Sequence, residues 1–258
     1  MADRQFDRRR LLTQAAALLG ALPLAGCEDL SANPAILNVL GLAETVTHRL
    51  QRLILSGNSL AREYTEADIS KTFKPNGTTE PEDEEYQDLL GGQFKDWRLQ
   101  ITGLVERPQK LSLEELRALP SRTQITRHDC VEGWSCIGKW KGTPLAPLLD
   151  RAGLKPQARY LVFYCADTLG ASLDAAKYYE SIGLEDAFHP QTLLAYEMND
   201  APLTVPHGAP LRLRVERQLG YKMAKYVMRI EAVDSFATIG GGKGGYWEDR
   251  GYEWYAGI

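Results

Sequence analysis

Cysteine and histidine are both scarce in this chain of 258 residues. The four cysteines stand at positions 27, 130, 136 and 165, and the four histidines at positions 48, 128, 189 and 207. This spacing contains no CxxC pair, no CxxCH haem-attachment motif and no regular disulfide framework. A zinc site needs clustered Cys and His ligands, so the sequence argues against one. Without an attached haem, any electrons would have to pass to or from another subunit.

An excess of basic charge is also missing. The chain has 30 Lys and Arg against 34 Asp and Glu, a net charge of -4 and a pI near 5.7. This balance leaves no electrostatic footprint for a nucleic acid. With 44% hydrophobic and 25% charged residues, and no internal repeat, the chain suits one large or two small globular domains.

An export signal is predicted at residues 1–27. Three arginines, Arg8 to Arg10, precede an apolar run from Leu11 to Leu24 that is too short to span a bilayer comfortably. This arrangement resembles a twin-arginine signal, and Leu24-Ala25-Gly26-Cys27 resembles a lipobox, which would place a lipid on Cys27. In the alternative, Cys27 is incidental to an ordinary signal. We expect a periplasmic protein in either case, and in the first case one anchored to the membrane through Cys27.

Residues 28–58 are predicted to form an amphipathic helix and linker. Asn33-Pro34 is typical of a helix start, and Gly57 ends the pattern. Between them apolar residues recur every three or four positions, at Val39, Leu42, Val46, Leu50 and Leu53. The helix either packs on the domain behind it or lies at the membrane surface and docks a membrane partner.

Residues 59–258 are predicted to form one α+β domain with a mixed sheet. Runs typical of strands fall at Trp97–Val105, Gln124–Asp129, Tyr160–Ala166, Leu193–Met198, Leu211–Val215 and Tyr226–Val233. Short helices are predicted after the capping box Ser112/Glu115 and from Thr143-Pro144. Strands with few and short helices favour a mixed α+β domain over a doubly wound sheet. The glycine-rich, aromatic tail after Gly240 is expected to fold back onto the domain.

Cys130 follows the strand Gln124–Asp129 and opens a glycine-containing loop, where a ligand or substrate can reach it. It can be an inert structural thiol. It can be a nucleophile with His128, two residues back on the same strand face, as its base. It can also be a ligand to a soft metal. The residues alone leave these three hypotheses open.

A candidate anion site lies in the second half of the chain. The segment from His207 to Arg212 (HGAPLR) places a histidine and an arginine at the mouth of a strand. The segment Gly220 to Lys225 (GYKMAK) adds a glycine-initiated loop with lysine. Arginine, lysine and backbone amides that converge form a phosphate cradle. In the alternative, these are surface charges on strand ends.

Taken in order, these segments resemble the sulfite-oxidase superfamily of molybdopterin enzymes. The resemblance runs over about residues 60–258 and rests on Trp97–Val105, LSLEELRALP, the strand before Cys130, LLAYEMNDAPL, HGAPLRL and GYKMAKYVMRIEAV. The loop CVEGWS is most similar to the bacterial branch that contains the periplasmic methionine-sulfoxide reductase catalytic subunit. The immunoglobulin-like and haem domains of sulfite oxidases are missing, which favours the same branch.

The resemblance implies a molybdenum cofactor in which molybdopterin carries no nucleotide. Cys130 would be the thiolate ligand to the metal, and the pterin would supply the other sulfurs. The same resemblance, with His128 as a neighbouring candidate, implies cofactor contacts at Asn76, Thr168 (or its neighbour Asp167), His207, Arg212, Met223, Ala224 and Lys225.

This chain departs from sulfite oxidases just after the cysteine. Those enzymes carry an arginine there, whereas this chain has Glu132, Gly133 and Trp134. A carboxylate repels sulfite, and Trp134 offers an apolar wall to a neutral or thioether-like substrate. Glu132, Trp134 and Tyr221 are therefore the candidates for the substrate side, beside Cys130. The cysteines at positions 136 and 165 either pair after export or stay as free thiols.

The leading hypothesis is an exported molybdenum oxidoreductase that moves one oxygen atom and two electrons and reduces a small sulfoxide or N-oxide. Electrons would come from a separate partner, a membrane haem protein or a soluble cytochrome. The alternatives are sulfite-type oxidation in the same fold, a metal-free thiol oxidoreductase using Cys130 and His128, and a scaffold that binds the pterin without turnover.

Overall fold

The computed structural model describes Val46 and residues 59–170 and 175–258. The last two ranges belong to one compact unit, Gln51–Ile258. The predicted export signal, residues 1–27, lies outside the described residues, as does residue range 28–58 except for Val46, which is helical and exposed. Among the described residues, no helix has the length and apolar character needed to cross a membrane.

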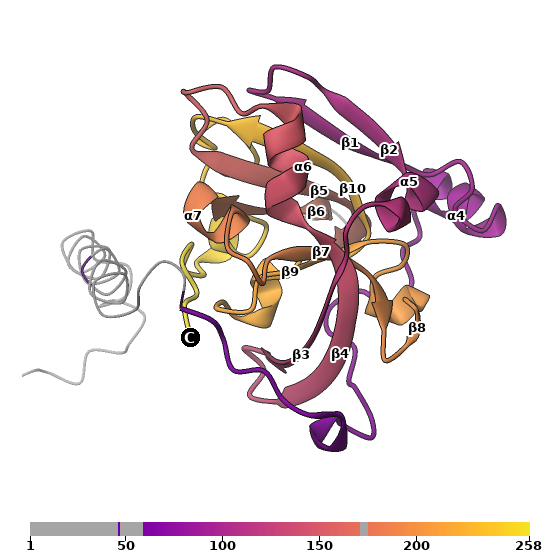
Figure 1. Ribbon diagram of the computed structural model, residues 1–258. Coiled ribbons are helices and arrows are strands. Elements are labelled where there is room, and N and C mark those ends of the chain that lie inside the picture. Colours follow the sequence, from indigo (N-terminus) through magenta and orange to yellow (C-terminus); the bar gives the residue numbers. More distant parts are fainter. Residues whose placement is uncertain (1–45, 47–58, 171–174) are drawn as a thin grey trace, which may run out of the picture. The chain divides into compact units, whose positions relative to one another are not determined.

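Two five-stranded sheets form the frame of this unit in its described part (Figure 1). In the first sheet, β1 and β10 run parallel, while the other neighbours run antiparallel. Its strands, in spatial order, are β2 (Gln109–Ser112), β1 (Arg98–Gly103), β10 (Val227–Val233), β5 (Tyr160–Leu169) and β6 (Ala176–Gly183). The parallel pair makes this sheet mixed, which confirms the predicted α+β class.

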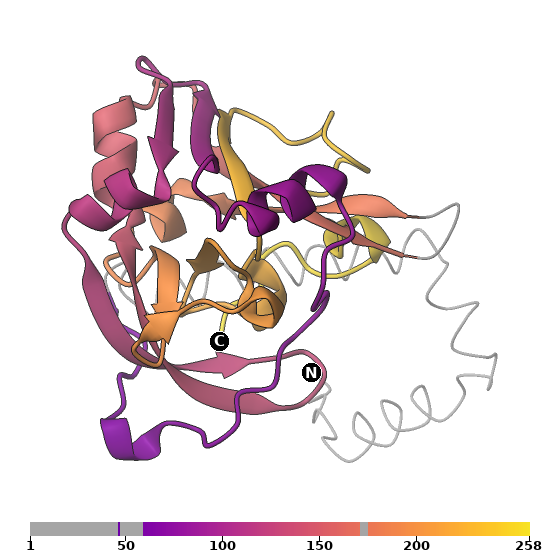
Figure 2. The ribbon, with the colours of Figure 1, turned by 90° about the vertical axis from the view of Figure 1, so that its right-hand side faces the viewer.

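The second sheet carries the turn that contains Cys130. β3 and β4 form a long antiparallel hairpin, which Figure 2 shows as the curved pair at the bottom of the unit. β4 pairs with β7, and β7 pairs with both β8 and β9. The strands are β3 (Arg122–Asp129), β4 (Ser135–Pro144), β7 (Leu193–Met198), β8 (Ala201–Pro202) and β9 (Arg212–Arg214).

Short helices cover and connect the sheets. α6 (Leu145–Ala152) lies across one face of the first sheet (Figure 1). It buries one helical face, made of Leu145, Leu148, Leu149 and Ala152. The other described helices are α4 (Glu84–Gly91), α5 (Leu113–Ala118) and α7 (Leu184–Ala187), and the 3-10 helices are η1 (Glu66–Asp68), η3 (Val205–His207), η4 (Gly220–Lys222) and η5 (Glu248–Arg250).

The main apolar core draws on both sheets. Ile101 of β1, Phe163 of β5 and Leu194 of β7 are fully buried in the same cluster. Burial of side chains this large stabilises the folded chain by about 1.5–3 kcal/mol each. Because strands of both sheets share this core, the loops that leave the sheets are held in fixed positions relative to one another.

The predicted strands and the capping box are confirmed. The amide of Glu115 donates to Ser112 Oγ at 3.1 Å, and the amide of Ser112 donates to Glu115 Oε2 at 2.7 Å. The alternation in β3 is confirmed as well, since Gln124, Thr126 and His128 are buried. This buried face is polar, which is unusual for a strand and needs partners inside the fold.

Four strands were not predicted from the sequence, namely β2, β4, β6 and β8. β6 contains Glu180 and Ser181, whose polar side chains are fully buried, so its sequence shows no apolar run. β4 contains Gly142, where an added Cβ would lie 2.2 Å from the carbonyl oxygen of Leu194. The close approach of β7 thus requires glycine within β4, although glycine normally argues against a strand.

The aromatic tail folds back onto the domain, as expected. The amide of Leu219 donates to the carbonyl of Ala256 at 2.9 Å, and the amide of Ile258 donates to the carbonyl of Arg217 at 3.0 Å. Tyr246 is buried in the main core. The C-terminal residues therefore form part of the wall of the domain.

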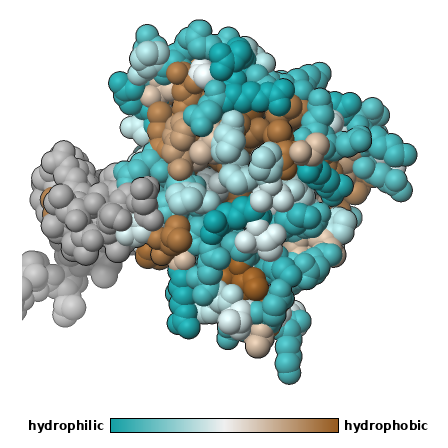
Figure 3. Space-filling model, viewed as in Figure 1, coloured by the Kyte–Doolittle hydropathy of each residue, from teal (hydrophilic) through white to brown (hydrophobic). Residues whose placement is uncertain are grey.

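The face of the molecule seen in Figure 1 is largely hydrophilic, and the apolar residues visible there form separate patches (Figure 3).

Candidate active site

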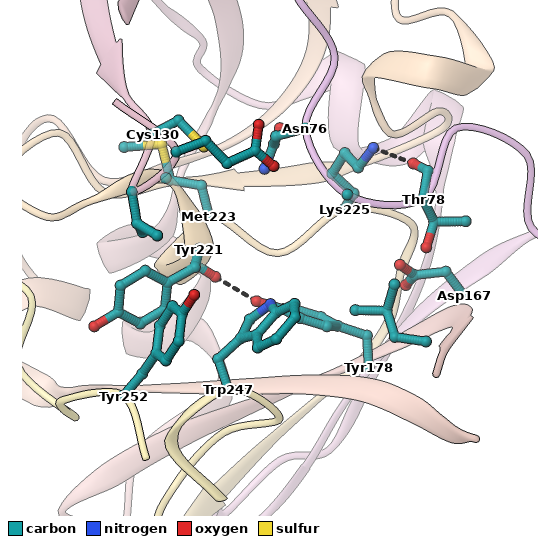
Figure 4. Close-up of a pocket in the computed structure, with 15 residues that line it drawn as sticks. Asn76, Thr78, Cys130, Asp167, Tyr178, Tyr221, Met223, Lys225, Trp247 and Tyr252 are labelled. Atoms are coloured by element: carbon teal, nitrogen blue, oxygen red, sulfur yellow. Dashed lines mark hydrogen bonds between the residues drawn. The ribbon is translucent and has the colours of Figure 1, made fainter. Parts of the chain in front are cut away.

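Distant segments of the chain meet around a cavity of about 150 Å³. Its lining comes from residues 76–78, the turn after β3, the end of β5, β6, the η4 loop and the C-terminal tail. Figure 4 shows Lys225, Thr78 and Asp167 together on one side, and Tyr221, Tyr252 and Trp247 together on another. The cavity therefore has a polar end and an aromatic end, with Cys130 in its wall.

Cys130 is held by the tight turn that joins β3 to β4. Its amide donates to the carbonyl of Trp134 at 2.9 Å, and its carbonyl accepts from the amide of Gly133 at 3.0 Å. Gly133 has a φ of 83°, a backbone conformation that glycine adopts without strain. The turn thereby fixes the half-buried thiol at the cavity wall.

Burial raises the pKa of the Cys130 thiol, and the amide of Glu132 offsets this effect in part. The free side chain is therefore a protonated thiol at neutral pH, which is a poor nucleophile. A metal ion bound there would have to displace the proton. In residues 59–170 and 175–258, no three His, Cys, Asp or Glu side chains gather in a group that could hold a metal.

His128 does not line the cavity that Cys130 lines. Its Nδ1 faces Arg214 Nη1 at 3.0 Å and Met223 Sδ at 3.2 Å, while its Nε2 is buried and has no hydrogen-bond partner among the residues that the structure describes. Burial, together with Arg214, lowers the pKa of His128 well below its usual range. Gly220 packs directly on the imidazole, since an added Cβ would lie 2.4 Å from Nε2. This arrangement gives the Cys130 thiol no hydrogen-bonded base.

The polar end of the cavity is formed by Asn76, Thr78, Asp167 and Lys225. Lys225 Nζ donates to the carbonyl of Thr78 and, at 2.9 Å, to that of Pro206. Burial lowers the pKa of Lys225 to about 7, and burial raises the pKa of Asp167 to about 6. Both groups therefore titrate near neutrality.

The HGAPLR loop packs behind Lys225. Gly208 has a φ of 101°, and an added Cβ would lie 2.9 Å from Lys225 Cβ, so this position requires glycine. Arg212 is fully buried there, with its guanidinium 4.9 Å from the centre of the Trp140 ring. One nitrogen, Nη1, donates to the carbonyl of His207 at 3.0 Å. Burial, with Arg214 nearby, lowers the pKa of Arg212 to about 9.

The aromatic end brings together Tyr221, Trp247 and Tyr252. The rings of Trp247 and Tyr252 stack with centroids 5.2 Å apart, and Tyr221 meets Tyr252 edge-on at 5.2 Å. Tyr221 Oη donates to the carbonyl of Glu253 at 2.6 Å, which fixes its ring against the tail. An apolar or polarisable group fits such a surface.

Glu132 lies at the cavity wall and carries a negative charge. Its Oε2 accepts from Trp134 Nε1 at 2.8 Å and pairs with Lys74 Nζ at 3.2 Å. The bond from Trp134, and then that from Lys74, lower the pKa of Glu132. The carboxylate is thus ionised, and both of its partners hold it in place.

Half of the predicted site residues line the cavity. The predicted residues that line it are Asn76, Cys130, Glu132, Tyr221, Met223 and Lys225. The predicted residues outside the lining are His128, Trp134, Thr168, His207, Arg212 and Ala224. At the end of β5 the buried side chain that lines the cavity is Asp167, whereas Thr168 is exposed.

Three aromatic residues of the lining, Tyr178, Trp247 and Tyr252, were not predicted. Tyr178 lies in β6, which the sequence pattern did not predict because the strand contains the buried polar residues Glu180 and Ser181. The tail carries so many aromatics that packing was expected, but the sequence pattern does not say which of them face a cavity.

The residues present fit an anionic, nitrogen-rich cofactor. Asn76 Oδ1, Asp167 Oδ1, and Nε and Nη2 of Arg212 are buried without a hydrogen-bond partner in the described part of the chain. Burial of such groups is costly unless a partner satisfies them. The oxygens suit the N–H groups of a heterocycle, and the guanidinium suits a phosphate.

A thiol in the cavity wall, buried polar groups that lack a partner in the described part of the chain, and an aromatic end fit an oxidoreductase that binds molybdopterin. A family model described as the oxidoreductase molybdopterin binding domain matches residues 89–238. The chain therefore belongs to this family and is a molybdopterin-dependent oxidoreductase.

Two relatives extend the similarity beyond this domain. The first, from Azospira oryzae, carries the name "Putative protein-methionine-sulfoxide reductase subunit YedZ1" and is 36% identical over 98% of this chain and 89% of its own length. The second, from Xanthomonas campestris, is named as the protein-methionine-sulfoxide reductase catalytic subunit MsrP and is 33% identical over 88% of this chain and 70% of its own length. A solved structure of the sulfane dehydrogenase SoxCD from Paracoccus pantotrophus overlaps with a TM-score of 0.48, at 29% identity over 55% of this chain and 39% of the other.

Proposed function

We propose that this chain reduces sulfoxides with electrons from a separate donor. The reaction is R₂S=O + 2 e⁻ + 2 H⁺ → R₂S + H₂O, in which the sulfur–oxygen bond breaks and the oxygen leaves as water. The observation that carries this proposal is the cavity itself, which has Cys130 in its wall, a polar end and an aromatic end. The names of the two relatives, both protein-methionine-sulfoxide reductases, support a thioether sulfoxide as the substrate.

The polar end would hold the pterin. Cys130 would bind the molybdenum, Asn76 and Asp167 would accept hydrogen bonds from the ring, and Arg212 and Lys225 would hold the phosphate. We infer the nucleotide-free form of the cofactor for this site. The molybdenum cofactor would supply the two-electron oxygen-atom chemistry, and the protein would bind and orient the cofactor and the substrate and shield them from water.

The aromatic end would hold the substrate. Sulfur in a thioether or sulfoxide makes favourable contacts with ring edges, and the rings exclude water from the reacting oxygen. Glu132 places an ionised carboxylate, paired with Lys74, at the cavity wall. Sulfite would be repelled there, while a neutral sulfoxide would not.

The test begins with the purified chain produced in cells that make the molybdenum cofactor. Elemental analysis should find about one molybdenum per chain, in line with one site per domain. With reduced viologen as the electron donor, methionine sulfoxide and dimethyl sulfoxide should be reduced, and sulfite should not be oxidised. Sulfite oxidation without sulfoxide reduction would contradict the proposed direction, and full activity without molybdenum would favour the thiol mechanism.

We further propose that residues 1–27 export the chain to the periplasm and that Cys27 carries a lipid. Cys27→Ser should then release the protein from the membrane fraction into the soluble periplasmic fraction, because a serine cannot form the thioether to the lipid. Fractionation followed by immunodetection measures this change. An unchanged distribution would mean that any membrane association comes from residues 28–58 or from a partner.

The electron donor is proposed to be a separate haem protein, in the membrane or soluble. The sequence supports a separate donor, because it has no CxxCH motif and no cysteine cluster for an iron–sulfur centre.

A further inference from the structure

A fully buried charge cluster lies directly behind the aromatic end of the cavity. Lys222 Nζ donates to Glu180 Oε1 and to Glu248 Oε1, each at 2.5 Å. All three side chains have no solvent exposure. Two carboxyl groups thus share one ammonium inside the domain, and full ionisation would leave a net negative charge buried.

Each member of this cluster adjoins an aromatic residue of the cavity. Lys222 follows Tyr221 in η4, and Glu248 follows Trp247 at the start of η5. Glu180 lies two residues from Tyr178 on the same face of β6, and Tyr178 lines the cavity. Two of these aromatic residues contact the cluster, since the Tyr178 hydroxyl lies 3.5 Å from Glu180 Oε2 and Lys222 Nζ lies 5.9 Å from the centre of the Tyr221 ring.

The hydrogen bonds of Glu180 leave a place for a proton on one oxygen. Oε1 accepts from Lys222 and, at 2.8 Å, from the amide of Ser181. Oε2 faces the hydroxyl of Tyr178 at 3.5 Å, and that hydroxyl donates to the carbonyl of Tyr221. A proton on Oε2 would complete a chain from Glu180 through Tyr178.

The surroundings of Glu180 favour its protonated form. Burial raises the pKa of Glu180 well above its usual range; Lys222 opposes this effect, and the carboxyl of Glu248 adds to it. The thiol of Cys165, on β5, and the phenols of Tyr178 and Tyr179 are further titratable groups that interact with it, and burial raises the pKa of all three. Lys222 is thus the one cation in this set, and it is shared with Glu248.

We propose that Tyr178 protonates the oxygen that leaves the substrate and that Glu180, in the Glu180–Lys222–Glu248 cluster, replaces the proton. This inference rests on the proposed sulfoxide reduction, which consumes two protons per turnover. One proton passes from the Tyr178 hydroxyl to the oxygen while the sulfur–oxygen bond breaks, and the Glu180 carboxyl reprotonates Tyr178. The second comes from water at the cavity mouth, and water reloads Glu180 after the product leaves.

The other acids of the cavity are less suited to this task. Glu132 is ionised, because Trp134 and Lys74 lower its pKa. Asp167, with a pKa of about 6, has mostly lost its proton at neutral pH and lies at the polar end. Among these cavity residues, Tyr178 is therefore the one whose hydroxyl lies close to a carboxyl group, that of Glu180, which is protonated at neutral pH.

The first experiment looks for the stored proton in the purified holoenzyme without turnover. Infrared spectroscopy should show the carbonyl band of a buried protonated carboxyl group at neutral pH, with a shift in D₂O. Glu180→Gln should remove this band. Glu248→Gln should remove it too, because Glu180 then becomes the remaining anionic partner of Lys222. A wild-type spectrum without the band would overturn the proposal.

The second experiment measures kcat against pH with reduced viologen and a saturating methyl sulfoxide. The wild-type kcat should fall as pH rises through the pKa of Glu180, because the acid form is the active one. Glu180→Gln and Tyr178→Phe should lower kcat about 100-fold or more and remove this dependence, with KM and molybdenum content little changed. Tyr179→Phe, which removes the next hydroxyl on β6, is the matched control and should behave like the wild type.

Glutamine has the shape and hydrogen-bonding groups of protonated Glu180, so it preserves a purely structural role. A wild-type kcat and pH profile in Glu180→Gln would therefore contradict proton delivery. A loaded wild-type enzyme that reduces no sulfoxide would instead contradict the proposed function, whatever the infrared spectrum shows.

Discussion

Cys130→Ala is expected to abolish both molybdenum binding and sulfoxide reduction. The turn between β3 and β4 holds this thiol at the cavity wall, and the described residues offer no cluster of protein ligands to replace it. Removal of even an outer partner of a metal ligand costs about 10- to 100-fold, so loss of the ligand itself should exceed about 100-fold. Elemental analysis and viologen oxidation measure the two effects on the same preparation.

The matched control is Cys136→Ala. Cys136 is another half-buried free thiol, on β4, where its sulfur lies 3.7 Å from the carbonyl of Thr72 and outside the cavity lining. This variant should keep its molybdenum and its activity. If Cys130→Ala kept full activity while Cys136→Ala lost it, the assignment of the metal ligand would be wrong.

Arg212→Met is expected to weaken cofactor binding without weakening the cofactor-free fold. Arg212 is a fully buried cation whose Nε and Nη2 have no partner in the described chain, so its burial is unfavourable until an anion arrives. A charge-assisted hydrogen bond to phosphate contributes about 1.5–3 kcal/mol, equivalent to roughly a 10- to 150-fold loss of affinity. Molybdenum per chain should fall, while the unfolding free energy of cofactor-free protein should stay the same or rise.

Arg214→Met, two residues along the same strand, tests the loss of a buried arginine that already has an anionic partner within the protein. Arg214 is also fully buried and packs on Trp140, with its guanidinium 4.3 Å from the ring centre. Unlike Arg212, it pairs with buried Glu216, at 2.6 Å. Its loss leaves that carboxylate unpaired, which costs about 3–5 kcal/mol. Chemical denaturation should therefore show a large loss for Arg214→Met and none for Arg212→Met; equal losses would contradict an anion site at Arg212.

The sequence pattern predicted the parts of the fold whose apolar residues repeat regularly. β5, β7 and β10 bury apolar side chains in runs, and the capping box at Ser112 marks the start of α5. β6 was missed because two of its buried residues, Glu180 and Ser181, are polar and interrupt the apolar pattern, and they find their partners in distant segments. A pattern of hydrophobic residues cannot show a pairing such as that of Glu180 with Lys222, 42 positions away in the chain.

The sequence by itself determined the chemistry available to this protein. The residues alone left Cys130 open between a structural thiol, a nucleophile and a metal ligand, and the ordered resemblance to the sulfite-oxidase superfamily made it the candidate ligand, with HGAPLR and GYKMAK as the candidate anion site. Short-range chain geometry fixes these features, because a turn or a glycine-rich loop presents its own residues.

Only the tertiary structure decided which residues share the cavity. It buried Arg212 behind Lys225, turned His128 away from Cys130, and brought Tyr178 and Trp247 to the aromatic end. It also placed Asp167, and not Thr168, in the cavity lining, because alternate residues of a strand face opposite sides. These outcomes depend on how two sheets and a C-terminal tail pack on one core, and residues that are far apart in the sequence meet only through that packing.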